Sequence, residues 1–179
     1  MVSQDSTVMT NLKASPPVLA SAGVWGGRVR VIVDTFETIA AGGATSVDAD
    51  GDFFRLCTLP SNARVLQFWA ASDDLDSSSA VALNYGLYTA DTATVLDEDM
   101  FASAVNHQSA VVPTDINFEA RPGDIAHWAM PLWERLNTAI GGSVTTDPGI
   151  HYDICATQNA AATTTLAATY SFMILYTID

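Results

Sequence analysis

The sequence has little positive charge. Lys13 is its only lysine, and seven basic residues stand against twenty acidic ones, which gives a formal net charge of −13. A surface of this sign repels the phosphates of nucleic acids and disfavours anionic membranes. We therefore expect neither nucleic acid nor a membrane among the partners. An acidic surplus is also a common means of keeping a protein soluble.

Cysteine is scarce, and long apolar runs are absent. Disulfide-scaffold proteins use far more cysteine than Cys57 and Cys155 provide. Both lie in predicted strands, so we expect two reduced, buried thiols, with a bridge between adjacent strands as the alternative. Met1–Pro17 is polar and has no signal-peptide core. No apolar run reaches the ~20 residues that span a bilayer.

The usual catalytic motifs are also missing. No nucleophile elbow, P-loop or dinucleotide-binding glycine motif occurs. The histidines His107, His127 and His151 are far apart and show no metal-ligand spacing. A cysteine–histidine nucleophile pair is the remaining alternative. We assign no catalytic or cofactor-binding residue and expect a protein that is not an enzyme.

One acidic loop is the best candidate for a metal site. Asp48–Asp52 gathers three carboxylates, which hard cations prefer. An EF-hand loop needs glycine at its sixth position and glutamate at its twelfth, but these positions hold Phe53 and Leu59. We interpret the loop as an acidic turn and assign no metal ligands.

What the sequence does have is a succession of short strand-like runs. Phe53–Leu59 and Arg64–Ala70 flank the turn Pro60–Asn62, where proline ends the first run. At 179 residues one domain is the default. The other predicted strands are Arg28–Glu37, Ala80–Tyr88, Ala110–Asn117, Ile125–Trp128, Tyr152–Thr157 and Leu166–Ile178.

Two short helices complete the prediction. Asp97 can cap a helix that ends near Asn106, because the acidic residues that follow suit the positive end of a helix dipole. Pro131 fits the first turn of a helix over Leu132–Asn137. About eight strands with two minor helices predict an all-β fold, an antiparallel two-sheet β-sandwich.

In the first and last predicted strands, the sequence shows which side chains share a face. Val29, Val31 and Val33 alternate with polar residues, which indicates a half-buried strand. The last strand has an apolar face of Tyr170, Phe172, Ile174, Tyr176 and Ile178, but its other face carries Met173 and Leu175. Such a strand is either central in the sandwich or partly covered by another subunit.

The four tryptophans could in principle form a sugar-binding platform. Trp69 and Trp128 lie among apolar neighbours in predicted strands, so we expect them in the core rather than at a ligand; the fourth is Trp133. Trp25 lies in a hinge that precedes the first strand, and tryptophan is enriched at interface hot spots. It is therefore a candidate intersubunit anchor.

The N-terminal region differs from the rest of the chain. Residues 1–24 are rich in Ser, Thr, Asn and Ala and contain Pro16–Pro17, which favours extended backbone. We predict an extended arm over 1–24 and a β-sandwich domain over 25–179. Candidate interface residues are Leu12, Val18, Leu19 and Trp25 in this region, and Tyr170, Phe172, Met173, Leu175 and Tyr176 in the last strand.

Several motifs together resemble a known family. They are Leu59-Pro-Ser-Asn-Ala-Arg-Val-Leu66, Leu83-Asn-Tyr-Gly-Leu-Tyr88, Asp97-Glu-Asp-Met-Phe-Ala-Ser-Ala104, Met130-Pro-Leu-Trp-Glu-Arg-Leu136 and Asp147-Pro-Gly-Ile-His-Tyr-Asp-Ile-Cys-Ala-Thr157. The combination resembles small virion structural proteins of tailed bacteriophages, the jelly-roll-like capsid decoration or cement proteins. The resemblance extends over roughly residues 28–179.

This resemblance implies a role and partners. It implies a capsid decoration protein on the outer surface of the head, made in the host cytoplasm, which binds the major capsid protein and itself as a homo-oligomer, most simply a trimer. A tail, head-fibre or connector component is the alternative within the virion. A surface carbohydrate-binding module and a hydrolase are alternatives from other classes.

Overall fold

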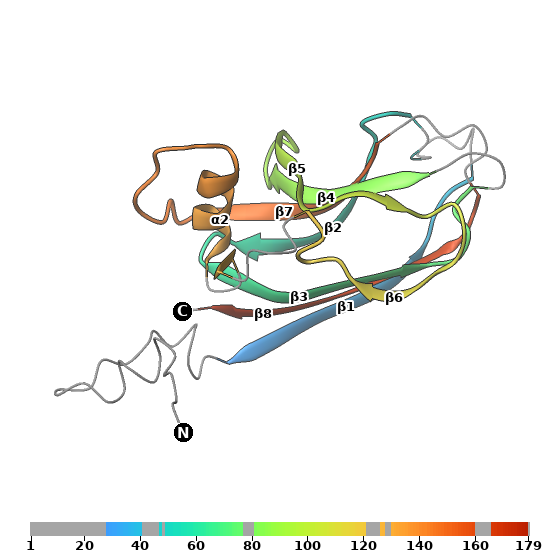
Figure 1. Cartoon of the computed structure of the whole chain (residues 1–179), viewed down its shortest axis with the longest axis horizontal. Coiled ribbons are helices and arrows are strands. Elements are labelled where there is room, and N and C mark those ends of the chain that lie inside the picture. Colours follow the sequence, from blue (N-terminus) through green and yellow to red (C-terminus); the bar gives the residue numbers. More distant parts are fainter. Residues whose placement is uncertain are drawn as a thin grey trace, which may run out of the picture.

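The computed structural model describes residues 28–40, 47, 49–76, 81–120, 126–127, 130–159 and 166–178. These residues form two four-stranded antiparallel sheets that pack face to face (Figure 1). The predicted β-sandwich is confirmed. Residues 1–27 lie outside the described part of the chain, so the predicted arm and its interface residues Leu12, Val18, Leu19 and Trp25 are untested.

One sheet, which we call the open sheet, has the order β1-β8-β3-β6. Its strands are β1 (Val29–Glu37), β3 (Ala63–Ser72), β6 (Val111–Asp115) and β8 (Thr169–Ile178). β8 is central, between β1 and β3. This central position does not cover the outer face of β8, so it does not by itself explain the apolar residues Met173 and Leu175 there.

The other sheet, which we call the covered sheet, has the order β2-β7-β4-β5. Its strands are β2 (Phe53–Pro60), β4 (Ala82–Thr89), β5 (Val95–Asn106) and β7 (His151–Gln158). Seven consecutive residues of β7, from Tyr152 to Gln158, are buried. Both faces of this strand are therefore shielded from solvent.

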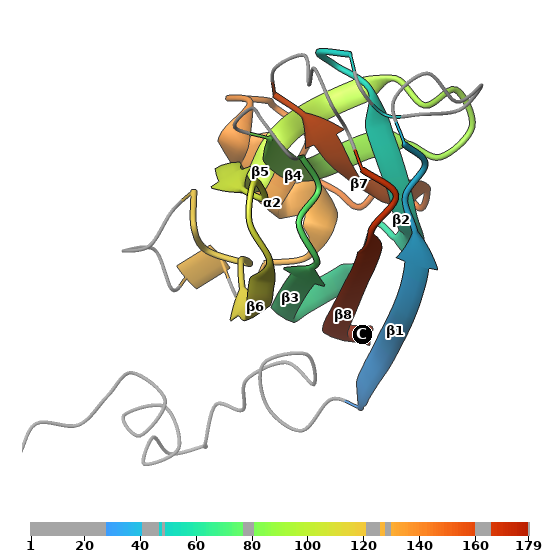
Figure 2. The same cartoon turned by 90° about the vertical axis from the view of Figure 1, so that its right-hand side faces the viewer.

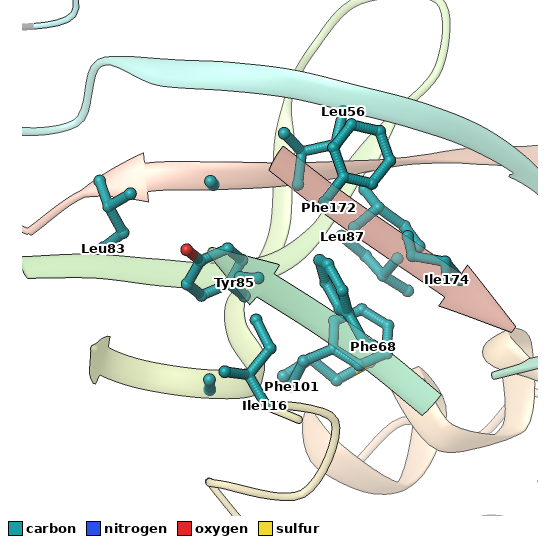
Figure 3. Close-up of a cluster of buried hydrophobic side chains, with 14 of the residues drawn as sticks. Leu56, Phe68, Leu83, Tyr85, Leu87, Phe101, Ile116, Phe172 and Ile174 are labelled. Atoms are coloured by element: carbon teal, nitrogen blue, oxygen red, sulfur yellow. The ribbon is translucent and has the colours of Figure 1, made fainter. Parts of the chain in front are cut away.

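The core fills the space between the sheets. Alternate residues of each strand point inward, as a pleated strand requires. Figure 3 shows side chains from both sheets meeting there. Fully buried members of this cluster include Phe68, Leu83, Tyr85, Leu87, Phe101 and Ile174. The Phe68 ring packs edge-on against Tyr85 and Phe101, at centroid distances of 5.5 Å in both cases.

A chain of hydrogen bonds crosses this apolar core. Tyr170 donates its hydroxyl proton to the Tyr85 hydroxyl (2.7 Å). Tyr85 in turn contacts Nε2 of His107 (2.8 Å), and Nδ1 of His107 contacts the Ser72 hydroxyl (2.8 Å). Since Tyr85 already accepts from Tyr170, its own proton goes to Nε2, and Nδ1 carries the imidazole proton. With a neutral His107 imidazole, every donor and acceptor in this series of hydrogen bonds therefore has a partner.

One short helix closes an end of the sandwich. α2 (Leu132–Ala139) begins after Pro131, as predicted, and extends slightly beyond the expected Asn137. Its Arg135 is buried and lies 4.5 Å from the Phe101 ring centroid. Its guanidinium donates to the side chain and carbonyl of Asn117 and to the carbonyl of Met100. The helix is thereby fixed to β5 and to the segment that follows β6.

The helix expected from Asp97 to Asn106 is wrong, because these residues belong to β5. β5 pairs with β4 in an irregular register and crosses Gly86 closely. A Cβ atom at Gly86 would lie 2.0 Å from the carbonyl oxygen of Asp97. Tertiary pairing with β4 thus overrides the local capping signal. Of the strand expected at 125–128, only Ala126 and His127 are described, and they form a 3₁₀ turn.

Candidate docking surface

The outer face of the open sheet is the most unusual surface of the described chain. Val29, Val31 and Val33 of β1 are 58%, 58% and 65% exposed. The three valines share one face, as predicted, but this face points to solvent. The alternate residues Ile32 and Phe36 pack against the core instead. The sequence pattern correctly predicted that the three valines share one face, but it wrongly predicted that this face is buried.

The strand register places these valines beside further apolar side chains. Val33 lies opposite Met173, which lies opposite Trp69, so that one row crosses β1, β8 and β3. In the next row Val31 lies opposite Leu175, and Leu175 lies opposite Gln67. Large side chains from three strands therefore form a continuous apolar surface on the outside of the sandwich.

A shallow hollow of about 230 Å³ lies at one end of this surface. Its lining is almost entirely apolar and comes from four strands or their flanks: Val33, Trp69, Ala70, Ala71, Pro113, Ser171, Phe172 and Met173. Such a hollow has the shape and chemistry to receive an apolar side chain.

Trp69 has a buried polar atom beside this hollow. Its half-buried indole lines the hollow, and its Nε1 forms no hydrogen bond with any residue that the structure describes. We predicted that Trp69 packs in the core, and this is wrong, because the pleat turns Phe68 and Ala70 inward. Trp128 lies outside the described residues.

The residues predicted for an interface in the last strand divide between the two faces. Tyr170 and Phe172 are buried in the core, and Tyr176 packs against it. Met173 and Leu175 are half-buried on the outer face. Of these five residues, only Met173 and Leu175 place side chains on the outer surface. We therefore keep the interface prediction for these two residues.

The other residues singled out from the sequence form no comparable site. Within the described ranges, no group of three or more potential ligands could hold a metal ion, and Asp48 itself lies outside them. Cys57 and Cys155 are free and lie on the paired strands β2 and β7. Burial, and to a smaller extent the charge of nearby Asp153, raises the pKa of each thiol to about 12.

Neither His107 nor His151 forms a nucleophile pair with a cysteine among the described residues. Both ring nitrogens of His107 are engaged by Ser72 and Tyr85, and burial lowers its pKa to about 4. His151 is exposed at the start of β7. No helix in the described part of the chain is long and apolar enough to cross a bilayer.

Comparison with known proteins identifies the fold. No family model matches the sequence, and no curated protein matches it. One solved structure with this fold is a chain of the cyanophage Pam1 capsid asymmetric unit, with a TM-score of 0.50 and 19% identity. The match covers 93% of this chain and 97% of that one.

A second structure belongs to the capsid of Ralstonia phage GP4. Its TM-score is 0.52 at 16% identity, with 84% of this chain and 85% of that chain covered. The resemblance drawn from the sequence motifs is consistent with both. The chain thus shares nearly its whole fold with chains found in two phage capsids.

Proposed function

We propose that this protein is a structural component of a phage virion, and specifically a decoration protein that binds the outside of the capsid. The main support is one combination of observations: a fold shared over nearly the whole chain with capsid chains, and an uncovered apolar face on the open sheet. Soluble monomers rarely expose a contiguous apolar surface without a partner for it.

In this proposal the outer face of the open sheet is the surface that meets the major capsid protein. Val33, Met173 and Trp69 surround the hollow that receives an apolar side chain of the shell. The net charge of −13 favours a position outside the shell, away from packaged nucleic acid. The mechanism is mechanical, since many weak contacts across neighbouring capsomers add through avidity.

The N-terminal arm has a separate part in the proposal. Leu12, Val18, Leu19 and Trp25 provide the apolar anchors of residues 1–27, which enter the sandwich directly at β1. We propose that this arm contacts a neighbouring subunit, most simply in a trimer. A decoration trimer suits the local three-fold positions of an icosahedral shell, where three equivalent contacts are available.

The test is binding of the purified protein to capsids that lack it. Wild-type protein should saturate the shells at a fixed stoichiometry and raise their melting temperature. Val33→Asp should weaken this binding at least tenfold, because it places a charge in the apolar row. Val95→Asp is the matched control, since Val95 is also exposed, at 50%, but lies on β5 of the covered sheet.

The alternatives predict different results. If wild-type protein does not bind shells, the decoration role is wrong, and isolated tails, head fibres and glycan columns become the next targets. Equal binding by Val33→Asp and Val95→Asp would show that the shell meets another surface. A protein lacking residues 1–23 that still saturates the shells would refute the role of the arm.

A further inference from the structure

β1 is an open edge of the sandwich. Among the described residues it pairs only with β8, and Figure 2 shows it at the margin of the open sheet. Natural edge strands are usually short, bulged, or protected by lysine or proline. Val29–Glu37 is nine residues long, contains neither lysine nor proline, and pairs with β8 in an unbroken register. Its charged residues Arg30 and Asp34 have opposite signs, so they disfavour strands with an unlike charge pattern but leave the edge open to a complementary strand.

The backbone groups that face this open edge belong to the odd-numbered residues. The Thr38 N–H donates to the carbonyl of Ala168, so the even positions bond toward β8. The Thr35 N–H donates to its neighbour Asp34 (2.8 Å) and not to β8. Since bonding directions alternate along an antiparallel strand, Val29, Val31 and Val33 present their N–H and C=O groups outward.

The charges along β1 are self-complementary. Arg28 immediately precedes it and Arg30 lies in its first half, whereas Asp34 and Glu37 lie in its second half. Neither arginine forms an ion pair with any residue in the described part of the chain. Two copies of such a strand attract each other when they run antiparallel, because each basic half then faces an acidic half.

The side-chain pattern selects one register for this pairing. With two β1 strands centred on Ile32, Arg30 of each copy lies opposite Asp34 of the other, and Val31 lies opposite Val33. The outward backbone groups then face one another in hydrogen-bonded pairs. Moving the centre to Val31 sets Arg30 against Ile32, and moving it to Val33 sets Ile32 against Asp34. Of these three registers, only the Ile32 register sets Arg30 against Asp34 while its central positions pair apolar with apolar.

We propose that β1 pairs antiparallel with β1 of a second copy of this chain, about a two-fold axis at Ile32. The two open sheets then join into one continuous sheet, and their outer apolar faces become one surface. This inference goes beyond the decoration role and does not depend on it. In a trimeric decoration protein, the β1 pair would join neighbouring trimers.

Charge reversal tests the pairing in the full-length protein. Arg30→Asp and Asp34→Arg each set like charges against each other at two places, so each variant alone should associate at least tenfold more weakly in sedimentation equilibrium. An equimolar mixture of the two variants should recover the association, because every contact between unlike copies is then complementary. The double variant Arg30→Asp/Asp34→Arg should recover it as well. Association that is absent in the wild type, or unchanged in both single variants, overturns the proposal.

A cysteine scan gives an independent readout. Ile32→Cys should form a disulfide-linked dimer under mild oxidation, because residues facing each other in a non-hydrogen-bonded pair lie about 4.5 Å apart at Cα, within disulfide reach. Val33→Cys is the control, since position 33 faces position 31 of the second copy. Equal cross-linking of the two variants overturns the register. Shell binding and β1 pairing are measured separately, so the failure of one leaves the other standing.

Discussion

Acid should destabilise this fold through one buried histidine. His107 is fully buried and neutral, and both of its ring nitrogens are hydrogen-bonded inside the core. Protonation would put a second N–H where Nε2 now accepts the proton of Tyr85, and it would leave a charge in the apolar interior. Burial accordingly lowers the pKa of His107 from 6.5 to about 4.

The size and sign of the effect follow from this difference in pKa. In the unfolded chain His107 binds a proton as the pH falls below about 6.5, whereas in the folded chain it stays neutral down to about 4. Stability from this group is thus fully present above pH 6.5 and is lost as the pH falls toward 4. Between pH 7 and pH 5 the loss is about 2 kcal/mol, taking 1.36 kcal/mol for each unit of difference in pKa.

The assay is urea unfolding at pH 7 and pH 5, with His107→Gln compared with wild type. The variant loses hydrogen bonds and should be less stable at pH 7, but it lacks the titrating group. The gap between wild type and variant should therefore shrink by about 2 kcal/mol on going to pH 5. Carboxylates that titrate in this range affect both proteins equally and cancel from the difference.

A matched control and a clear refutation exist. His151 is exposed at the start of β7, so His151→Gln should leave the free energy of unfolding at pH 7 close to the wild-type value. A gap between wild type and His107→Gln that stays constant from pH 7 to pH 5 would refute the reasoning. It would mean that the folded protein accommodates a charged imidazole at this position.

Three further predictions concern packing and reactivity. Gly86→Ala should prevent β5 from packing closely on β4, so that little soluble protein is recovered. Gly142→Ala is the control, because its new methyl group meets the side chain of Asn137, which can move, and this variant should fold. Equal melting temperatures of the two variants would contradict this prediction. Arg135→Met leaves buried acceptors without a donor and should lower the free energy of unfolding by about 3 kcal/mol in urea titration, and a wild-type value would contradict the bonding described for the guanidinium. Cys57 and Cys155 have pKa values of about 12, so few of their side chains are reactive thiolates at pH 8. Both should therefore react with a thiol reagent roughly a thousand times more slowly in the folded than in the unfolded protein. Rapid labelling of either thiol would contradict their burial.

Much of the fold could be predicted because its signals are local. Turn residues separate the strands, and Pro60–Asn62 joins β2 to β3 as its composition indicates. The strand predicted over Ala80–Tyr88 likewise corresponds to β4, whose Leu83, Tyr85 and Leu87 lie in the core. Pro131 marked the start of α2 for a similar reason, since a proline at a helix start loses no hydrogen bond.

The errors arose where tertiary contacts decide the outcome. Asp97 begins a good local helix signal, but β5 gains a partner in β4, and its irregular path through Ala104 at a φ of 53° breaks the simple alternation. Period-2 patterning also cannot tell an inner from an outer face when both are apolar. This is why Val33 and Trp69 were assigned to the wrong side of the sheet.

The position of β8 has a consequence for synthesis of the protein. β1 and β3 are both hydrogen-bonded to β8, which begins only at Thr169. Val29 of β1 pairs with Thr177 of β8, which is synthesised much later. The open sheet therefore cannot form before β8 has been synthesised, whereas every strand of the covered sheet is complete by Gln158. The covered sheet can therefore assemble first, and β8 then closes the sandwich by inserting between β1 and β3.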